Sequence, residues 1–108
     1  LIENDAGDVV QPDVSWAGGL LELKRIAAMA KPNGLPVVPH YTTPYTCHFV
    51  ASCAESPFGE YMGGYHTGVE PNNPVIDGEP LPEDGTIELG DDPGFGVDLN
   101  RDAVVPLH

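Results

Sequence analysis

The sequence predicts an α/β fold in which short strands alternate with helices, as in a parallel sheet or a (β/α) barrel. Two short apolar runs, at 8–13 and 35–40, flank a helical pattern over 20–31. A second helix at 44–56 and a third short run at 58–62 follow. Strands and helices that alternate through short turns are typical of right-handed βαβ units.

The first strand is predicted from the β-branched run that follows Asp8 and stops at Pro12-Asp13. Such a run suits a buried strand of a parallel sheet. Ahead of it, Leu1-Ile2-Glu3-Asn4 resembles the end of a helix and no Met begins the chain, so we expect the natural amino terminus to lie upstream. After it, Gly18-Gly19 breaks the chain.

The first helix is predicted from apolar residues that repeat with the helical period, with charged residues on the opposite side. It ends at Pro32-Asn33-Gly34, a strong terminator. The apolar positions are Leu20, Leu23, Ile26, Ala27 and Ala30.

The next units are a strand over Leu35–His40, a helix and a third strand over Phe58–Met62. Thr43 is a suitable N-cap for a helix that starts at Pro44 and runs toward Ser56. We therefore predict that residues 1–62 form βα units of a parallel sheet or a (β/α) barrel.

After Met62 the periodicity disappears and Gly and Pro become frequent. The exception is Thr86–Leu89, where a short strand is expected after the Asp84-Gly85 turn. We predict that 63–108 is an irregular tail that packs on other parts of a larger protein.

The charge balance excludes several classes of partner. Seventeen acidic residues and four basic ones give a formal net charge of −13. No cluster of Lys and Arg is available for phosphate backbones or anionic membranes, so we expect neither nucleic acid nor membrane as a partner. Without an apolar stretch long enough for a membrane span or a signal peptide, a cytoplasmic location is expected. A high-salt cytoplasm and an ordinary acidic surface would both explain the charge.

Three polar residues lie at or near the carboxyl ends of the predicted strands: Asp13, His40 and Glu60. In barrel enzymes this edge carries the catalytic groups, and the separations of 27 and 20 residues (40 − 13 and 60 − 40) approach the roughly thirty residues of one βα unit. A carboxylate beside a histidine fixes the imidazole tautomer and leaves a base that titrates near neutrality. The alternative is structural: His40 would bond a loop and Asp13 would cap a turn. Glu60 alone is the weaker candidate.

Other chemistry finds little support. His48, Cys47 and Cys53 match no zinc spacing and suit a packed helix face, and two cysteines make no disulfide framework, so we expect them reduced. No nucleophile elbow, Gly-x-Gly-x-x-Gly or P-loop is present, which argues against hydrolases and nucleotide enzymes. An acidic run lacks the order of a calcium loop and suits a solvated surface; it consists of Glu83, Asp84, Glu88, Asp91 and Asp92.

Five short motifs in order resemble the enolase superfamily, within it the mandelate racemase group, and most of all the rhamnonate dehydratases. They are Asp-Val-Val-Gln-Pro-Asp (8–13), Gly-Gly-Leu (18–20), Val-Val-Pro-His (37–40), Pro-Phe-Gly-Glu-Tyr (57–61) and Pro-Gly-Phe-Gly-Val-Asp-Leu-Asn (93–100). The resemblance implies that 1–62 supplies about the sixth to eighth strands of a modified (β/α) barrel. It also implies that the tail completes an amino-terminal capping domain.

The resemblance further implies roles for the three polar residues. His40 would be the acid/base, Asp13 would orient it, and Glu60 would hydrogen-bond the substrate near its carboxylate. The implied reaction removes the proton α to the carboxylate of a sugar acid, forms an enediolate held by Mg²⁺, and expels the β-hydroxyl to give a 2-keto-3-deoxy acid.

In that family the three carboxylate ligands of Mg²⁺ come from earlier strands, upstream of Leu1. Glu3, Asp5 and Asp8 lie away from the catalytic edge and should not replace them. The chain alone should therefore be inactive and prone to aggregate, and the complete protein should form a homo-oligomer. An epimerase or cycloisomerase of the same superfamily is the alternative. A non-catalytic acidic module, in which the three polar residues would not converge, is an alternative of another class.

Overall fold

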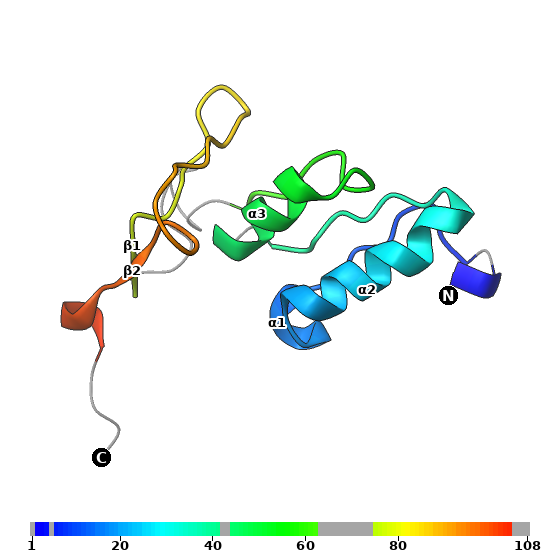
Figure 1. Ribbon diagram of the computed structural model, residues 1–108, viewed down its shortest axis with the longest axis horizontal. Helices are drawn as coiled ribbons and strands as arrows, with labels where there is room; N and C mark the ends of the chain where they lie inside the picture. The colour runs from blue at the N-terminus through cyan, green and yellow to red at the C-terminus, as the bar shows by residue number, and fades with distance from the viewer. Residues whose placement is uncertain (1, 5, 42–43, 63–74, 105–108) are drawn as a thin grey trace, which may run out of the picture. The chain divides into compact units, whose positions relative to one another are not determined.

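The computed structural model describes residues 2–4, 6–41, 44–62 and 75–104. The chain divides into two compact units, Leu1–Tyr61 and Met62–His108. The first unit contains the 3₁₀ helix η1 (Ile2–Asn4), the helices α1 (Val14–Ala17), α2 (Leu20–Ala30) and α3 (Pro44–Ser52), and the 3₁₀ turn η2 (Lys31–Asn33) (Figure 1). The second contains the short strands β1 (Ile76–Asp77) and β2 (Asp98–Leu99) and the 3₁₀ helix η3 (Arg101–Ala103).

Two extended segments of the first unit pair in parallel, as predicted. The pairing consists of isolated bridges, Val10 with Val37 and Asp13 with His40, rather than of long strands. Val10 N–H donates to Pro36 C=O at 3.0 Å, and His40 N–H donates to Pro12 C=O at 2.9 Å. Proline has no N–H, so it can only accept a hydrogen bond in this ladder. Because both segments contain prolines, their pairing is limited to isolated bridges.

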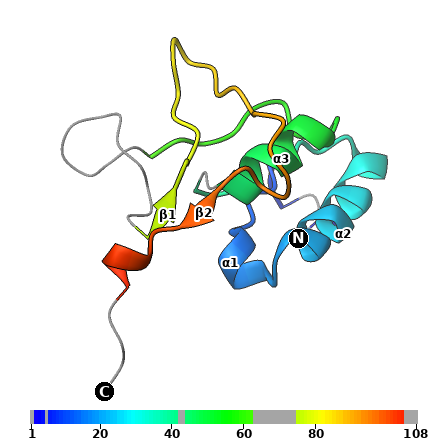
Figure 2. The same cartoon turned by 60° about the vertical axis from the view of Figure 1, so that its left-hand side comes forward.

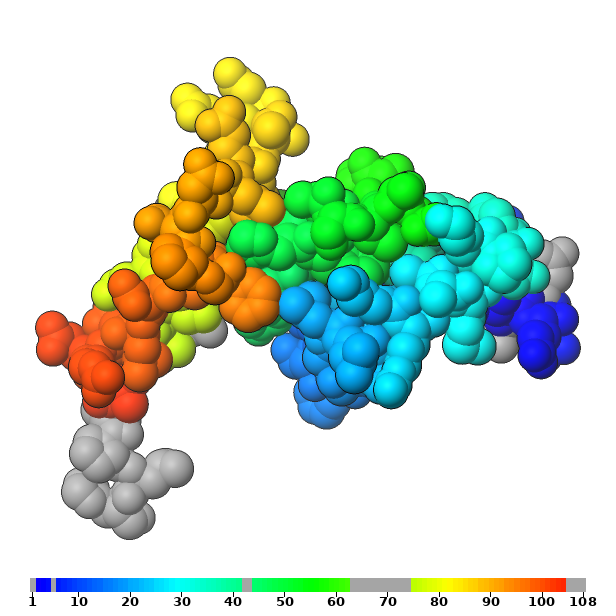
Figure 3. All heavy atoms as spheres, viewed as in Figure 1, coloured from blue at the N-terminus to red at the C-terminus, as the bar shows by residue number. Residues whose placement is uncertain are grey.

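The helix α2 confirms the predicted amphipathic pattern over the residues that it spans. It buries Leu23, Ala27 and Ala30, while Glu22 forms an ion pair with Arg25 on the exposed side. In the space-filling view α2, coloured blue to cyan, lies at the surface of this unit (Figure 3). The side of α2 that points inward therefore supplies a large part of the core.

Two glycines before α2 let the chain reverse between two helices. Gly18 has φ 105° and ends α1, and Gly19 has φ 92° and starts α2. Both values lie in the left-handed range that favours glycine. The predicted break at Gly18-Gly19 is thus confirmed as the junction of two helices.

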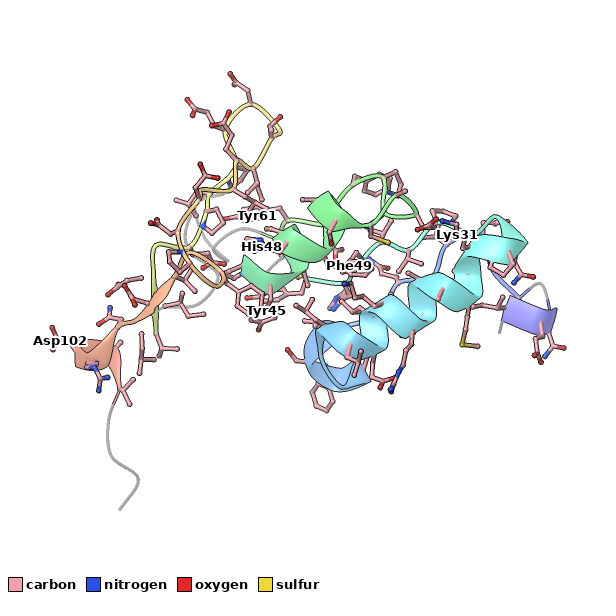
Figure 4. The ribbon with its side chains drawn as sticks, viewed as in Figure 1. Lys31, Tyr45, His48, Phe49, Tyr61 and Asp102 are labelled. Carbon is pink, nitrogen blue, oxygen red and sulfur yellow. The ribbon has the colours of Figure 1, made fainter. Side chains whose placement is uncertain are left out.

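The core of the first unit lies between α2, α3 and the paired segments. Val14, Val37 and Phe49 join the buried residues of α2 in one apolar cluster. Figures 1 and 2 both show α2 and α3 side by side, and Figure 4 shows Phe49 reaching from α3 toward α2. The alternation of paired segment, helix, paired segment and helix gives this unit the predicted α/β character.

The helix α3 begins at Pro44, as predicted, but ends at Ser52 instead of continuing to Ser56. The chain then turns, with Cys53 N–H donating to Val50 C=O and Ser56 N–H to Cys53 C=O. This turn brings the Glu55 carbonyl within 2.8 Å of Val37 N–H, a bond that a longer helix would forfeit. The predicted cap, Thr43, lies outside the described residues.

The prediction of a strand over Phe58–Met62 is wrong, since this segment forms no strand. A strand needs a backbone partner, and the backbone bond to the neighbouring segment is made earlier, at Glu55. Glu60 is joined to that segment through its side chain instead, as described below. The apolar residues of this run therefore led to a wrong prediction of a strand.

The second unit is less irregular than predicted over its described residues. The strands β1 and β2 pair antiparallel, with Ile76 opposite Leu99 and Asp77 opposite Asp98. The expected strand over Thr86–Leu89 is wrong: Thr86 only exchanges two backbone hydrogen bonds with Glu83, at 2.8 and 2.9 Å, around the predicted Asp84-Gly85 turn. Both central residues have positive φ, 49° and 78°, as in a type I′ turn that suits a hairpin, but the pairing stops after this one bridge.

No helix among the described residues is long and apolar enough to cross a membrane. Cys47 and Cys53 form no disulfide within the part of the chain that the structure describes. The ion pair between Lys31 Nζ and Glu55 Oε1, at 2.8 Å, joins the first residue of η2, labelled in Figure 4, to the turn after α3.

Candidate functional site

The parallel pairing places Asp13 beside His40 at the ends of their two segments. The two residues form a bridge, and His40 N–H is bonded to the carbonyl of Pro12. Side chains of paired residues on adjacent strands project from the same side of the sheet. The side chains accordingly meet, with His40 Nδ1 lying 3.1 Å from Asp13 Oδ2.

Asp13 divides its carboxylate between two tasks. Its Oδ1 accepts hydrogen bonds from the backbone N–H groups of Ser15, at 2.8 Å, and Trp16, at 3.1 Å, and so caps the helix α1. Its Oδ2 faces His40. The structural role considered for Asp13 in the sequence is therefore present, and it coexists with the pairing to His40.

The pKa of the Asp13 carboxyl reflects this environment. Burial alone would raise the pKa, but the hydrogen bonds with His40, Trp16 and Ser15 lower it below its ordinary value of 3.8. Hydrogen bonds to the charged form of a carboxyl always act in this direction. Asp13 is therefore ionised at neutral pH and can only accept from the imidazole.

An ionised Asp13 determines the tautomer of His40. Because a carboxylate has no proton to donate, the short contact requires the proton of a neutral imidazole to be on Nδ1. The other nitrogen, Nε2, then carries a free lone pair. With 46% of its side chain exposed, His40 is accessible to a ligand.

Glu60 lies on the other side of the imidazole. Its Oε2 accepts a hydrogen bond from Tyr41 N–H at 3.0 Å and lies 3.9 Å from His40 Nε2. The second distance exceeds that of a hydrogen bond. All three polar residues that the sequence singled out thus converge, with the ring of His40 between two carboxylates.

Metal ligation finds no support in the part of the chain that the structure describes. No group of three or more His, Cys, Asp and Glu side chains there could hold a metal ion. His48 lies in α3 and, together with Phe49, lines a cavity of about 160 Å³. The residues that the structure describes therefore do not fit a Mg²⁺ site.

One residue of the site has no signal in the sequence. Tyr41 has φ 62°, in the left-handed range, and its N–H binds Glu60. A glycine at this position would have suggested such a backbone, but tyrosine gives no indication of it. Only the structure identifies Tyr41 as part of the site.

The chain is similar in sequence to a known protein family and to curated proteins. The model of the family described as "Enolase C-terminal domain-like" matches residues 1–103. An L-rhamnonate dehydratase of Saccharopolyspora erythraea is 44% identical over 103 residues, which cover 93% of this chain and 26% of that protein. A protein of Caldivirga maquilingensis, provisionally named an L-rhamnonate dehydratase, is 41% identical over 108 residues, covering 97% of this chain and 27% of that protein. The chain thus spans about a quarter of the length of these curated relatives.

A solved structure is similar over the same extent. The crystal structure of rhamnonate dehydratase from Gibberella zeae complexed with Mg superposes with a TM-score of 0.82 at 36% identity, covering 94% of this chain and 26% of that one. These matches confirm the resemblance expected from the five motifs. They also confirm the predicted fold class, the carboxy-terminal part of a modified (β/α) barrel.

Proposed function

Because the chain belongs to the enolase C-terminal domain-like family, we propose that the complete protein containing it dehydrates a sugar acid, rhamnonate or a similar aldonate, to a 2-keto-3-deoxy acid. The chain corresponds to about a quarter of its relatives, so this activity is assigned to the whole protein. The relatives named as L-rhamnonate dehydratases support the substrate class.

The contact between Asp13 Oδ2 and His40 Nδ1 carries the proposal. It leaves Nε2 of an accessible imidazole as a base, which is what removal of a proton from a carbon next to a carboxylate requires. A histidine that served only a loop would not need an ionised partner on Nδ1 and an open Nε2.

In the proposed reaction, His40 Nε2 takes the proton from the carbon α to the substrate carboxylate. The electron pair of the broken C–H bond moves onto the carboxylate and gives an enediolate. The β-hydroxyl then leaves with a proton as water, and the resulting enol becomes the 2-keto-3-deoxy acid. Protonated His40 can supply that proton, and Asp13 stabilises the imidazolium between the two steps.

Glu60 is proposed to contact the substrate near its carboxylate. Its side chain is partly exposed, on the same side of the site as His40 Nε2. Mg²⁺ is proposed as the cofactor of the complete protein, because the similar Gibberella zeae enzyme is complexed with Mg. Its ligands would come from outside the described residues, which offer no suitable group.

The decisive experiment incubates the complete protein with Mg²⁺ and a panel of sugar acids and measures formation of 2-keto-3-deoxy acids. The His40→Asn variant is run beside it, with His48→Asn as the matched control on α3. Exchange of the α-proton with deuterated solvent is measured in parallel, because it reports the first step alone.

We expect product with at least one aldonate, loss of product and exchange in His40→Asn, and retention of both in His48→Asn. Exchange without dehydration would instead indicate an epimerase or racemase. No exchange and no product from a folded, metal-loaded protein would contradict the proposal.

A further inference from the structure

The backbone directly after His40 is in an unusual conformation. Tyr41 has φ 62°, and among the described residues only one other non-glycine, Asp84, has a positive φ. Asp84 belongs to a tight turn next to Gly85, where aspartate is tolerated. A bulky aromatic residue has no such local preference, so the surrounding contacts must hold Tyr41 in this conformation.

Two contacts hold the Tyr41 backbone in place. On one side its N–H donates to Glu60 Oε2 at 3.0 Å. On the other its carbonyl accepts a longer hydrogen bond, of 3.4 Å, from the hydroxyl of Thr46. Thr46 is buried in the first turn of α3, with 2% of its surface exposed, and is therefore a firm anchor.

The oxygen of Glu60 that binds Tyr41 is also the one that faces His40. Glu60 Oε2 stops 3.9 Å from His40 Nε2. Once His40 has taken up a proton on Nε2, a carboxylate without another donor would approach this imidazolium to about 2.8 Å, the usual length of a charge-assisted hydrogen bond. In that protonated state the Tyr41 N–H competes with His40 Nε2–H for the same oxygen.

We propose that Tyr41 is a positioning residue whose left-handed backbone directs its N–H onto Glu60 and keeps this carboxylate from closing onto Nε2 of the protonated His40. The Nε2–H group then stays open to the substrate. The catalytic consequence depends on the proposed function, whereas the geometric part does not. The proposed role belongs to the backbone conformation of Tyr41.

The test compares Tyr41→Gly, Tyr41→Val and Tyr41→Phe in the complete protein. Glycine adopts positive φ without strain and keeps the N–H, so kcat should stay within about threefold of the parent. Valine is β-branched and strongly disfavours this backbone, so kcat should fall by about tenfold or more. Tyr41→Phe should resemble the parent. Thermal unfolding of each variant checks that it folds.

Crystal structures of the parent and of Tyr41→Val supply a readout that needs no activity. At a pH at which the imidazole is protonated, we expect the distance between Glu60 Oε2 and His40 Nε2 to shorten in the valine variant toward about 2.8 Å. If that variant does not fold, Thr46→Val, which removes only the anchoring hydroxyl, replaces it, with Thr46→Ser as the control that restores the bond.

Two results would overturn the inference. Equal loss of kcat in Tyr41→Gly and Tyr41→Val would assign the role to the side chain, and an unchanged Glu60 to His40 distance in Tyr41→Val would remove the proposed competition. A parent protein that dehydrates no sugar acid would contradict the proposed function alone, because the distances would still decide the geometric part.

Discussion

The Oδ2 atom of Asp13 lies 3.1 Å from Nδ1 of His40, while Oδ1 of the same carboxylate caps the helix α1. The cap fixes the direction of the carboxylate, because two backbone N–H groups hold one oxygen in place. The second oxygen is therefore aimed at the imidazole without an additional support. A residue that stabilises local structure also orients the candidate base.

Substitution of Asp13 should separate these two roles. Asparagine caps helices about as well as aspartate, so Asp13→Asn should keep the cap and lose only the stabilisation that the ionised carboxylate gains from its hydrogen bonds. Its amide cannot stabilise the imidazolium, so kcat should fall by about 10²-fold or more. Asp13→Ala should lose the cap as well and be less stable by about 1 kcal/mol. Equal kcat in Asp13→Asn and the parent would refute the orienting role.

The lowered pKa of Asp13 predicts a dependence of stability on pH. A carboxyl whose pKa is lower in the folded than in the unfolded state stabilises the fold above its unfolded pKa, and this contribution is lost as pH falls through the folded pKa. The ordinary pKa of Asp13 is 3.8 and the folded one lies below it. The difference in free energy of unfolding between the parent and Asp13→Asn should thus stay constant above about pH 5 and shrink below about pH 4. Urea unfolding across this range measures it, and a difference that grows in acid would contradict the assignment.

Leu23 should be the residue of α2 to which stability is most sensitive. It is fully buried, at 0% exposed, in the cluster with Val37 and Phe49. Leu23→Ala should cost about 2–5 kcal/mol, because it removes buried methyl groups and leaves a cavity. The matched control is Leu21→Ala, since Leu21 is 61% exposed on the same helix and its truncation should change stability by less than about 0.5 kcal/mol. Denaturant unfolding measures the free energy of unfolding of both variants. Equal losses of stability in the two would contradict the prediction.

The parts of the fold that the sequence predicts are those with enough residues to show a period. The helix α2 has eleven residues and a clear apolar side. The helix α1 has four, and β1 and β2 have two each, so none of them can display one. The run at 58–62 resembled a strand in composition, but a strand also depends on a neighbour, which composition cannot supply.

The same reasoning applies to the site. Asp13, His40 and Glu60 could be predicted because each follows an apolar run, and the ends of parallel segments meet at one edge. The sharing of the Asp13 carboxylate between the cap of α1 and His40 could not be predicted, because the sequence allowed both roles and neither excluded the other. Tyr41 contributes through its backbone, which its residue type does not indicate. The catalytic roles of the three polar residues stay predictions.

Gly78 should be less replaceable than Gly85, another turn glycine of the second unit. Both have positive φ, 82° and 78°, so alanine is strained at either position. At Gly78 a Cβ would also lie 3.3 Å from the carbonyl oxygen of Gly96, whereas nothing lies within 4 Å at Gly85. Gly96 precedes β2 and Gly78 follows β1, so the added atom would push apart the chains that these strands join.

Gly78→Ala should therefore cost more than Gly85→Ala, by about 1 kcal/mol, and the excess should appear as opening of the β1 and β2 pair. Hydrogen exchange at Asn100 N–H, which is bonded to Val75 C=O at 2.9 Å, reports that opening. The exchange should accelerate in Gly78→Ala and stay near the parent rate in Gly85→Ala, because only the first substitution meets backbone. If both variants exchanged at the same rate, the positive φ would be the whole cost, and the close approach to Gly96 would not restrict this position.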